Sequence, residues 1–209
     1  GWVAWPDITM DGVNNPLFDR AVIAAASRWV DESAAPVTAA GHAFFRYTVG
    51  GLPPDEEQRH SAPDVDSGLN AVGMHGGLSF IVEAAVRRSA PDPSADLTAR
   101  VDAYLTLLWG FVQDTSRRAE DLAAVERARS RPLPPFLPPN YLWVNPGMTV
   151  TEFPVLEIAT GKKRLVPTAN LMTTLAVKKA VATPLGYAVE PRAAADFRLL
   201  LDRHGVPFE

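Results

Sequence analysis

Glu83 carries the carboxylate with the clearest chemical potential in this sequence. It stands in the strand-forming run LSFIVEAA (78–85), and glycines at positions 73, 76 and 77 precede that run. The flanking apolar residues predict a strand that is buried on both faces, as in the central strands of α/β sheets. A carboxylate there is costly unless it is paired or lies at the strand's carboxyl end, where open α/β sheets bind ligands. Glu83 is therefore either the partner of Arg87 or Arg88, or a catalytic base, and the glycines favour the base because they allow backbone to approach a ligand.

The four histidines form no metal-binding pattern, because HxxE, HExxH and HxH are all absent. The sequence has no cysteine, which excludes disulfides, thiolate nucleophiles and cysteine-ligated zinc. We expect His42 and His204 to be structural, the latter near a helix end. His60 and His75 are the histidines that could serve a site, so a metal-independent hydrolase that uses one of them with a carboxylate stays open.

Periodicity predicts the elements that must position these residues. Asn15-Pro16 has the form of a helix cap, and so does Asp92-Pro93 before the most regular apolar repeat in the chain. Residues 52–67 are rich in Pro, Asp and Glu without periodicity and predict a long loop. The predicted helices cover 16–33, 36–43, 93–129 and 191–204, and the predicted strands cover 44–49, 78–85, 149–158, 163–168, 171–178 and 185–189.

This order of elements predicts an α/β fold with a mixed sheet flanked by helices. Residues 1–130 form the α/β portion, and 140–209 form a small β-rich module with a terminal helix. Between them, 131–139 is a linker, because five of its nine residues are proline, which removes hydrogen-bond donors and extends the backbone.

Composition narrows the classes of function. The chain has 209 residues, 47% hydrophobic content and a net charge of −4, typical of a globular protein that no global field draws to nucleic acid or to a membrane surface. No signal peptide opens it, which favours the cytoplasm without fixing the compartment. Because the chain starts without methionine in a Trp-rich segment, we expect it to be a piece of a longer protein.

Several motifs resemble the zinc carboxypeptidases similar to carboxypeptidase A, and in particular their bacterial members. The segments GGLSFIVEAAVRR (76–88) and ARVDAYLTLLWGFV (99–112) match that family's strand and following helix, and PLGYAVEP (184–191) with LDRHGV (201–206) match its ending. The resemblance implies that Glu83 is the general base that activates metal-bound water. It also places Asn70 and His75 in the neighbourhood of the substrate.

The sequence departs from that family at the metal. The family binds zinc through an HxxE pair and a third histidine, but Val13 stands where the third histidine is expected in PDITMDGV (6–13). We therefore expect the C-terminal part of a zinc carboxypeptidase, with zinc in the parent protein and none in this chain alone, and without activity alone. The expected partners are a peptide or amide substrate and either the missing N-terminal part or a second copy. The alternative is a non-catalytic binding or structural module derived from the same fold.

Overall fold

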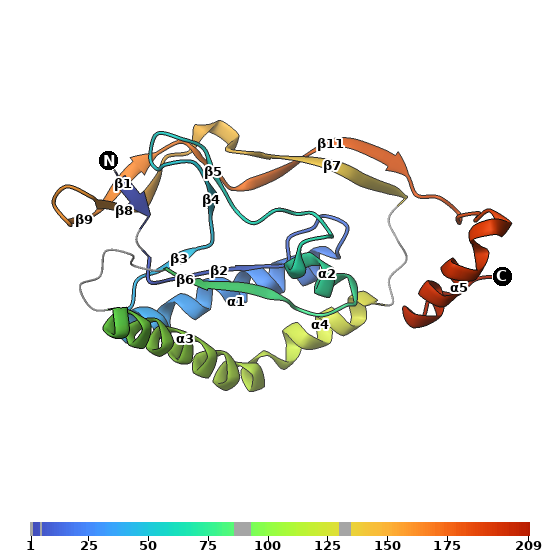
Figure 1. The fold of residues 1–209 in the computed structure, drawn as a ribbon, viewed down its shortest axis with the longest axis horizontal. Coiled ribbons are helices and arrows are strands. Elements are labelled where there is room, and N and C mark those ends of the chain that lie inside the picture. Colours follow the sequence, from blue (N-terminus) through green and yellow to red (C-terminus); the bar gives the residue numbers. More distant parts are fainter. Residues whose placement is uncertain (1, 5, 86–92, 130–134) are drawn as a thin grey trace.

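The computed structural model describes residues 2–4, 6–85, 93–129 and 135–209. In this part of the chain the elements form three layers, which confirms a mixed α/β protein (Figure 1). Long helices lie beneath a small central sheet, and most of the other strands lie above it. The central sheet is thus covered by helices on one face and by β-structure on the other.

The central sheet has the strand order β3 (Phe44–Arg46), β2 (Ile8–Gly12), β6 (Phe80–Ala84). β2 is parallel to β3 and antiparallel to β6. Alternate residues of β2 point to opposite faces, and the fully buried side chains of Ile8 and Met10 pack with apolar residues of the helices below. The candidate functional residues lie on the opposite, upper face of the sheet.

The first helix, α1 (Arg20–Ala39), is longer than predicted and starts later. Asp19 is its cap and accepts a hydrogen bond from the Ala21 amide. Asn15 does not cap it, because its side chain bonds instead to the Leu17 amide and the Pro63 carbonyl. The predicted second helix at 36–43 is wrong, because α1 continues through Pro36 to Ala39.

Two further helices complete the lower layer as predicted. α3 (Pro93–Thr115) continues through a 3-10 turn, η1 (Ser116–Arg118), into α4 (Ala119–Arg129). Arg118 is buried and forms ion pairs with Glu32 of α1 and Asp121 of α4, which join these two helices. No helix in the described ranges has the length and apolar content needed to cross a membrane.

The upper layer consists of three small sheets, with strand orders β1-β8-β9, β10-β5-β4 and β11-β7. Phe45 of the central sheet packs against Phe153 of this layer, with ring centroids 5.1 Å apart. The strands are β1 (Trp2–Ala4), β4 (Val49–Gly50), β5 (Gln58–Arg59), β7 (Phe136–Val144), β8 (Thr151–Glu157), β9 (Lys163–Thr168), β10 (Leu171–Met172) and β11 (Thr174–Ala182).

The two predicted portions of the chain share these sheets. β1 pairs with β8, and β5 pairs with β10, so strands from residues 1–130 and from 140–209 lie side by side. Within the predicted linker, β7 begins at Phe136, and 131–134 lie outside the described residues. The predicted strand at 185–189 is not one, whereas the strands near 149–158 and 163–168 are confirmed as β8 and β9.

Two shorter helices frame the site and the end of the chain. α2 (Gly68–Met74), which the sequence did not predict, is capped by Ser67. The predicted last helix is confirmed as a 3-10 turn, η3 (Pro191–Ala193), followed by α5 (Ala194–Arg203). Gly205 follows it with φ 62°, the left-handed conformation in which glycine ends helices.

Candidate functional site

Glu83 lies on the upper face of the central sheet. It is opposite Thr9 in the β2–β6 register, and both side chains point away from the face that Ile8 and Met10 bury against the helices. Its side chain is exposed to solvent. The prediction of a central strand buried on both faces is wrong, because among the described strands β6 pairs only with β2 and forms an edge of the sheet. Arg87 and Arg88, the predicted ion-pair partners, lie outside the described residues.

Tyr47 is the neighbour of Glu83 that sequence reasoning missed. It follows β3, and its amide donates to the Met10 carbonyl at 2.9 Å, which holds it beside the sheet. Burial raises the pKa of the Tyr47 phenol, and the charge of Glu83 and a hydrogen bond to its carboxylate raise this pKa further. The Tyr47 hydroxyl therefore keeps its proton at neutral pH and can donate a hydrogen bond to the Glu83 carboxylate.

Asp11 brings a second carboxylate to the end of β2, where it is buried. Its Oδ2 accepts from the Ser61 amide at 3.1 Å and from the Ser61 hydroxyl, and its Oδ1 accepts from the Gly12 amide at 3.0 Å. All three of these bonds are donated to the carboxylate by Gly12 and Ser61. They also fix the loop of residues 52–67 over the sheet.

Asn70 and Asn14 join that loop to the turn after β2. Asn70 is fully buried, and its Oδ1 accepts from the Asn14 amide at 3.1 Å and the Asn15 amide at 3.2 Å. Its Nδ2 donates to Asn14 Oδ1 and to the Ala62 carbonyl, both at 3.0 Å. A contact of Asn70 with substrate stays a prediction, and the contacts that the structure shows are structural.

His60 lies in the same loop and is buried. Its Nδ1 is 2.9 Å from the Tyr47 carbonyl, and its ring lies edge-on to Trp143 of β7, with centroids 5.8 Å apart. Burial lowers the pKa of His60 below its ordinary value of 6.5, so the ring is neutral at pH 7. A neutral ring that donates from Nδ1 to a carbonyl keeps its lone pair on Nε2.

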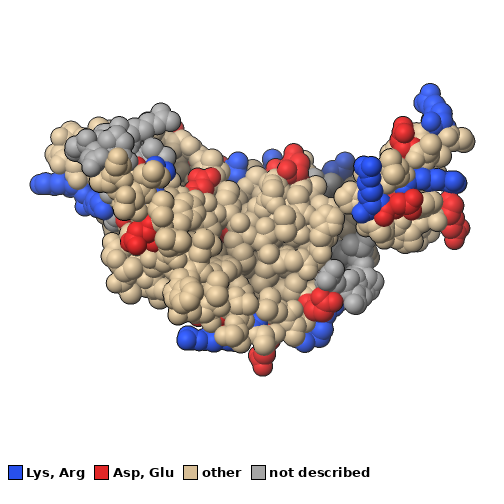
Figure 2. Space-filling model, turned by 60° about the horizontal axis from the view of Figure 1, so that its bottom comes forward, with Lys and Arg blue, Asp and Glu red and all other residues tan. Residues whose placement is uncertain are grey.

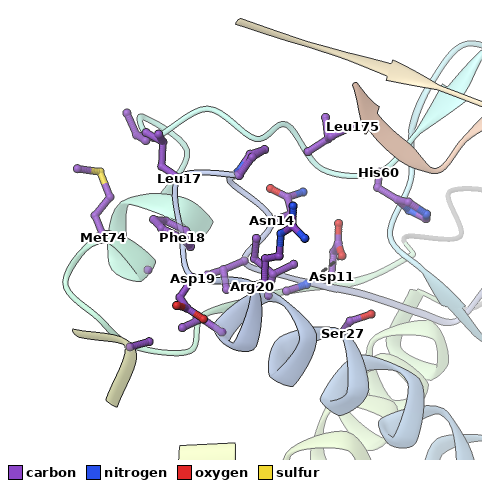
Figure 3. A pocket seen from close by; sticks show the side chains of 18 of the residues that line it. Asp11, Asn14, Leu17, Phe18, Asp19, Arg20, Ser27, His60, Met74 and Leu175 are labelled. Atoms are coloured by element: carbon purple, nitrogen blue, oxygen red, sulfur yellow. Dashed lines mark hydrogen bonds between the residues drawn. The ribbon is translucent and has the colours of Figure 1, made fainter. Parts of the chain in front are cut away.

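A cavity of about 1050 Å³ lies between the end of β2, the start of α1 and the ribbon of β7 and β11. In Figure 3 the side chains of Asp11, Asn14 and Arg20 lie between the start of α1 and Leu175 of β11. His60, Arg46 and Trp143 also line it. Arg46 Nε and Trp143 Nε1 are buried and have no hydrogen-bond partner among the described residues, so both are donors for a ligand or water.

The residues that the structure describes do not fit a zinc site. They contain no group of three His, Asp or Glu side chains placed to hold a metal ion. His42 is 3.0 Å from Asp102, and the exposed His75, at the end of α2, stacks on His204 with ring centroids 5.7 Å apart. The proposed substrate role of His75 is thus untested, and its ring contact is with the C-terminal helix.

No protein-family model, curated protein or solved structure matches this chain. A relation to the zinc carboxypeptidases therefore depends on the sequence motifs alone. Of the residues in the site, the sequence singled out Glu83 by its strand and His60 by its long loop, and the family resemblance pointed to Asn70. Tyr47 and Ser61 gave no comparable signal, because their partners are distant in sequence.

Proposed function

We propose that this chain supplies the proton-transfer residues of an amide-hydrolysing site similar to that of the zinc carboxypeptidases, with Glu83 as general base. The supporting observation is the pair formed by the exposed Glu83 carboxylate and the protonated Tyr47 hydroxyl on the upper face of the sheet. An exposed carboxylate can reach a water molecule, and the Tyr47 hydroxyl restricts the orientation of the carboxylate.

Glu83 would take a proton from a water molecule as the water oxygen attacks the carbonyl carbon of the scissile amide. As the C–N bond breaks, the same carboxyl group would return the proton to the leaving nitrogen, so that one water is consumed and an acid and an amine are formed. Tyr47 positions the carboxylate through its hydrogen bond.

In this proposal, any zinc ion would be bound by residues other than those that the structure describes. Because the described residues do not fit the ion, its ligands would come from another part of the parent protein. Zinc analysis of the 209-residue chain tests this division of the site. We expect far less than one zinc per chain after dialysis, and tightly bound stoichiometric zinc would contradict the proposal.

The role of Glu83 is tested by Glu83→Gln in the parent protein, with hydrolysis of a C-terminally blocked and an unblocked peptide as readouts. We expect a loss of at least about 100-fold, because a positioned base contributes 10²–10⁴-fold. Glu120→Gln, an exposed glutamate on α4, is the matched control and should keep full activity. If the parent is inactive on amides, the non-catalytic module is the better reading.

A second candidate is a metal-independent hydrolase that uses His60. The observation that favours it is the neutral imidazole lining the cavity that also contains Asp11. It requires hydrolysis by the 209-residue chain that persists in excess chelator and disappears in His60→Gln, a combination that the first candidate does not predict.

A further inference from the structure

The helix α3 has an apolar flank on which no other described part of the chain packs. The opposite side of the helix packs in the core through Ala103 and Leu107, which are 1% exposed. The residues of the exposed flank follow each other at helical spacing and are 47% to 65% exposed. They are Leu97, Val101, Leu105, Leu108, Trp109 and Val112. Figure 2, which shows the molecule from the helix side, has few charges over the middle of this face.

The outer edge of β6, which has no strand partner among the described residues, adjoins this flank. The Val13 amide donates to the Ser79 carbonyl, and the Ala85 amide donates to the Asp7 carbonyl. The odd-numbered residues of β6 therefore turn their backbone N–H and C=O groups toward β2. The even-numbered ones, Phe80, Val82 and Ala84, then turn theirs to the outer edge. The Tyr104 hydroxyl of α3 donates to the Val82 carbonyl at 2.8 Å, which joins strand edge and helix into one surface.

This edge lacks the features that keep sheet edges from pairing. β6 contains no lysine, no proline and no bulge against β2, and its one charge, Glu83, lies on the upper face. An edge that is apolar and regular is a template for another strand. An occupant that covers both features therefore has to offer a strand for β6 and an apolar surface for the flank of α3.

We propose that a second copy of this chain binds here, with the two β6 strands antiparallel about a two-fold axis at Val82. Val82 turns its N–H and C=O outward, and its carbonyl oxygen, which accepts the Tyr104 hydroxyl, has a second lone pair. The two copies can therefore exchange both hydrogen bonds at the axis. In this register Glu83 lies opposite Ile81 of the second copy, so that no carboxylate faces a carboxylate. The dimer has a continuous six-stranded sheet, with the two α3 flanks packed beneath it.

The size of the surface suits a stable dimer. Six side chains that each expose roughly 100 Å² give about 600 Å², and the strand edge adds to this, close to the about 800 Å² per partner of a standard interface. Two-fold pairing is the closed arrangement for a surface that complements itself.

Sedimentation velocity of the 209-residue chain from about 1 to 100 µM tests the proposal. We expect a species of twice the 22.6 kDa chain mass, and slow hydrogen exchange at the Val82 amide. Leu105→Lys, at a position 60% exposed, should weaken the dimer at least about 10-fold and speed exchange at Val82. The matched control is Leu165→Lys on β9, at a position 57% exposed, which should leave both unchanged.

Trp109→Ser provides a second variant with the same expected effect, and circular dichroism checks that each variant folds. A monomer throughout the concentration range overturns the proposal and indicates another occupant, such as a further part of a longer chain. A dimer that persists in both variants while the Val82 amide exchanges rapidly also overturns it, because the interface then lies elsewhere. Neither outcome bears on Glu83 as a base, which is tested by activity.

Discussion

Replacement of Asn70 should destabilise the protein more than any surface change of the same kind. The side chain is fully buried and forms five hydrogen bonds that join the turn after β2, the loop above the sheet and the cap of α2. In Asn70→Ala the amides of Asn14 and Asn15 and the carbonyl of Ala62 lose these partners. Each buried unpaired group costs about 1–3 kcal/mol, and water in the vacated space recovers part of the cost.

We therefore expect Asn70→Ala to lower the free energy of unfolding by about 3–5 kcal/mol. Asn70→Asp distinguishes the contribution of the accepting Oδ1 from that of the donating Nδ2. It keeps an oxygen for the Asn14 and Asn15 amides but turns the other oxygen toward Asn14 Oδ1 and the Ala62 carbonyl. The aspartate variant should thus lose at least as much stability as the alanine variant.

Urea unfolding followed by tryptophan fluorescence measures these differences, with an unchanged slope as the check that the denatured state is the same. Asn140→Ala, at an exposed position of β7, is the control and should change stability by less than about 0.5 kcal/mol. A loss below about 1 kcal/mol in Asn70→Ala would show that this amide network does not hold the site together.

Burial and Glu83 raise the pKa of Tyr47, so this pKa should fall toward 10.0 in Glu83→Gln. Ultraviolet difference titration against a Tyr47→Phe reference measures the change. An unchanged pKa would place Glu83 away from the hydroxyl. Because burial lowers the pKa of His60, the unfolded state binds a proton that the folded state refuses, so stability should be full above pH 6.5 and fall as the pH drops toward the folded pKa. His60→Gln should flatten this part of the stability profile in urea titrations, and an unaltered slope would refute the assignment. Gly73→Ala should lower the free energy of unfolding by about 1–3 kcal/mol, because a Cβ there would lie 2.7 Å from Val13 Cγ1 and 2.8 Å from Phe18 Cε2. Gly77→Ala has open space around the added Cβ and should be near neutral. Equal melting temperatures of the two variants would contradict the close packing at Gly73.

Local patterns in the sequence predicted most helices and several strands. The apolar repeat of α3 and the prolines before it and before the last helix are signals that do not depend on distant residues. The helix α1 shows where this reasoning fails. Asn15 resembles a cap, but its side chain forms bonds to the loop at Pro63, and Asp19 takes over the cap. A tertiary contact 48 residues away thus moved the start of the helix.

The environment of Glu83 was predicted only in part. Alternation along the strand correctly separates Glu83 from Val82 and Phe80, but strand position within a sheet depends on pairing that no local pattern contains. Phe80, Val82 and Ala84 instead pack on one face of the sheet, against the core that includes residues of α3. Among the described strands, β6 has a partner on one side only. Tyr47 and Ser61 could not be assigned from sequence, because their roles follow from contacts with Glu83 and Asp11, 36 and 50 residues away.

We propose Glu83 as the general base of an amide hydrolase whose metal ligands lie outside the described residues. The most direct measurement is the rate of peptide hydrolysis by the parent protein with Glu83→Gln, alongside its zinc content and melting temperature. If Glu83 is the base, we expect a loss of at least about 100-fold in kcat/KM, with the zinc content and melting temperature unchanged. Activity within a few-fold of the unmodified protein would contradict it.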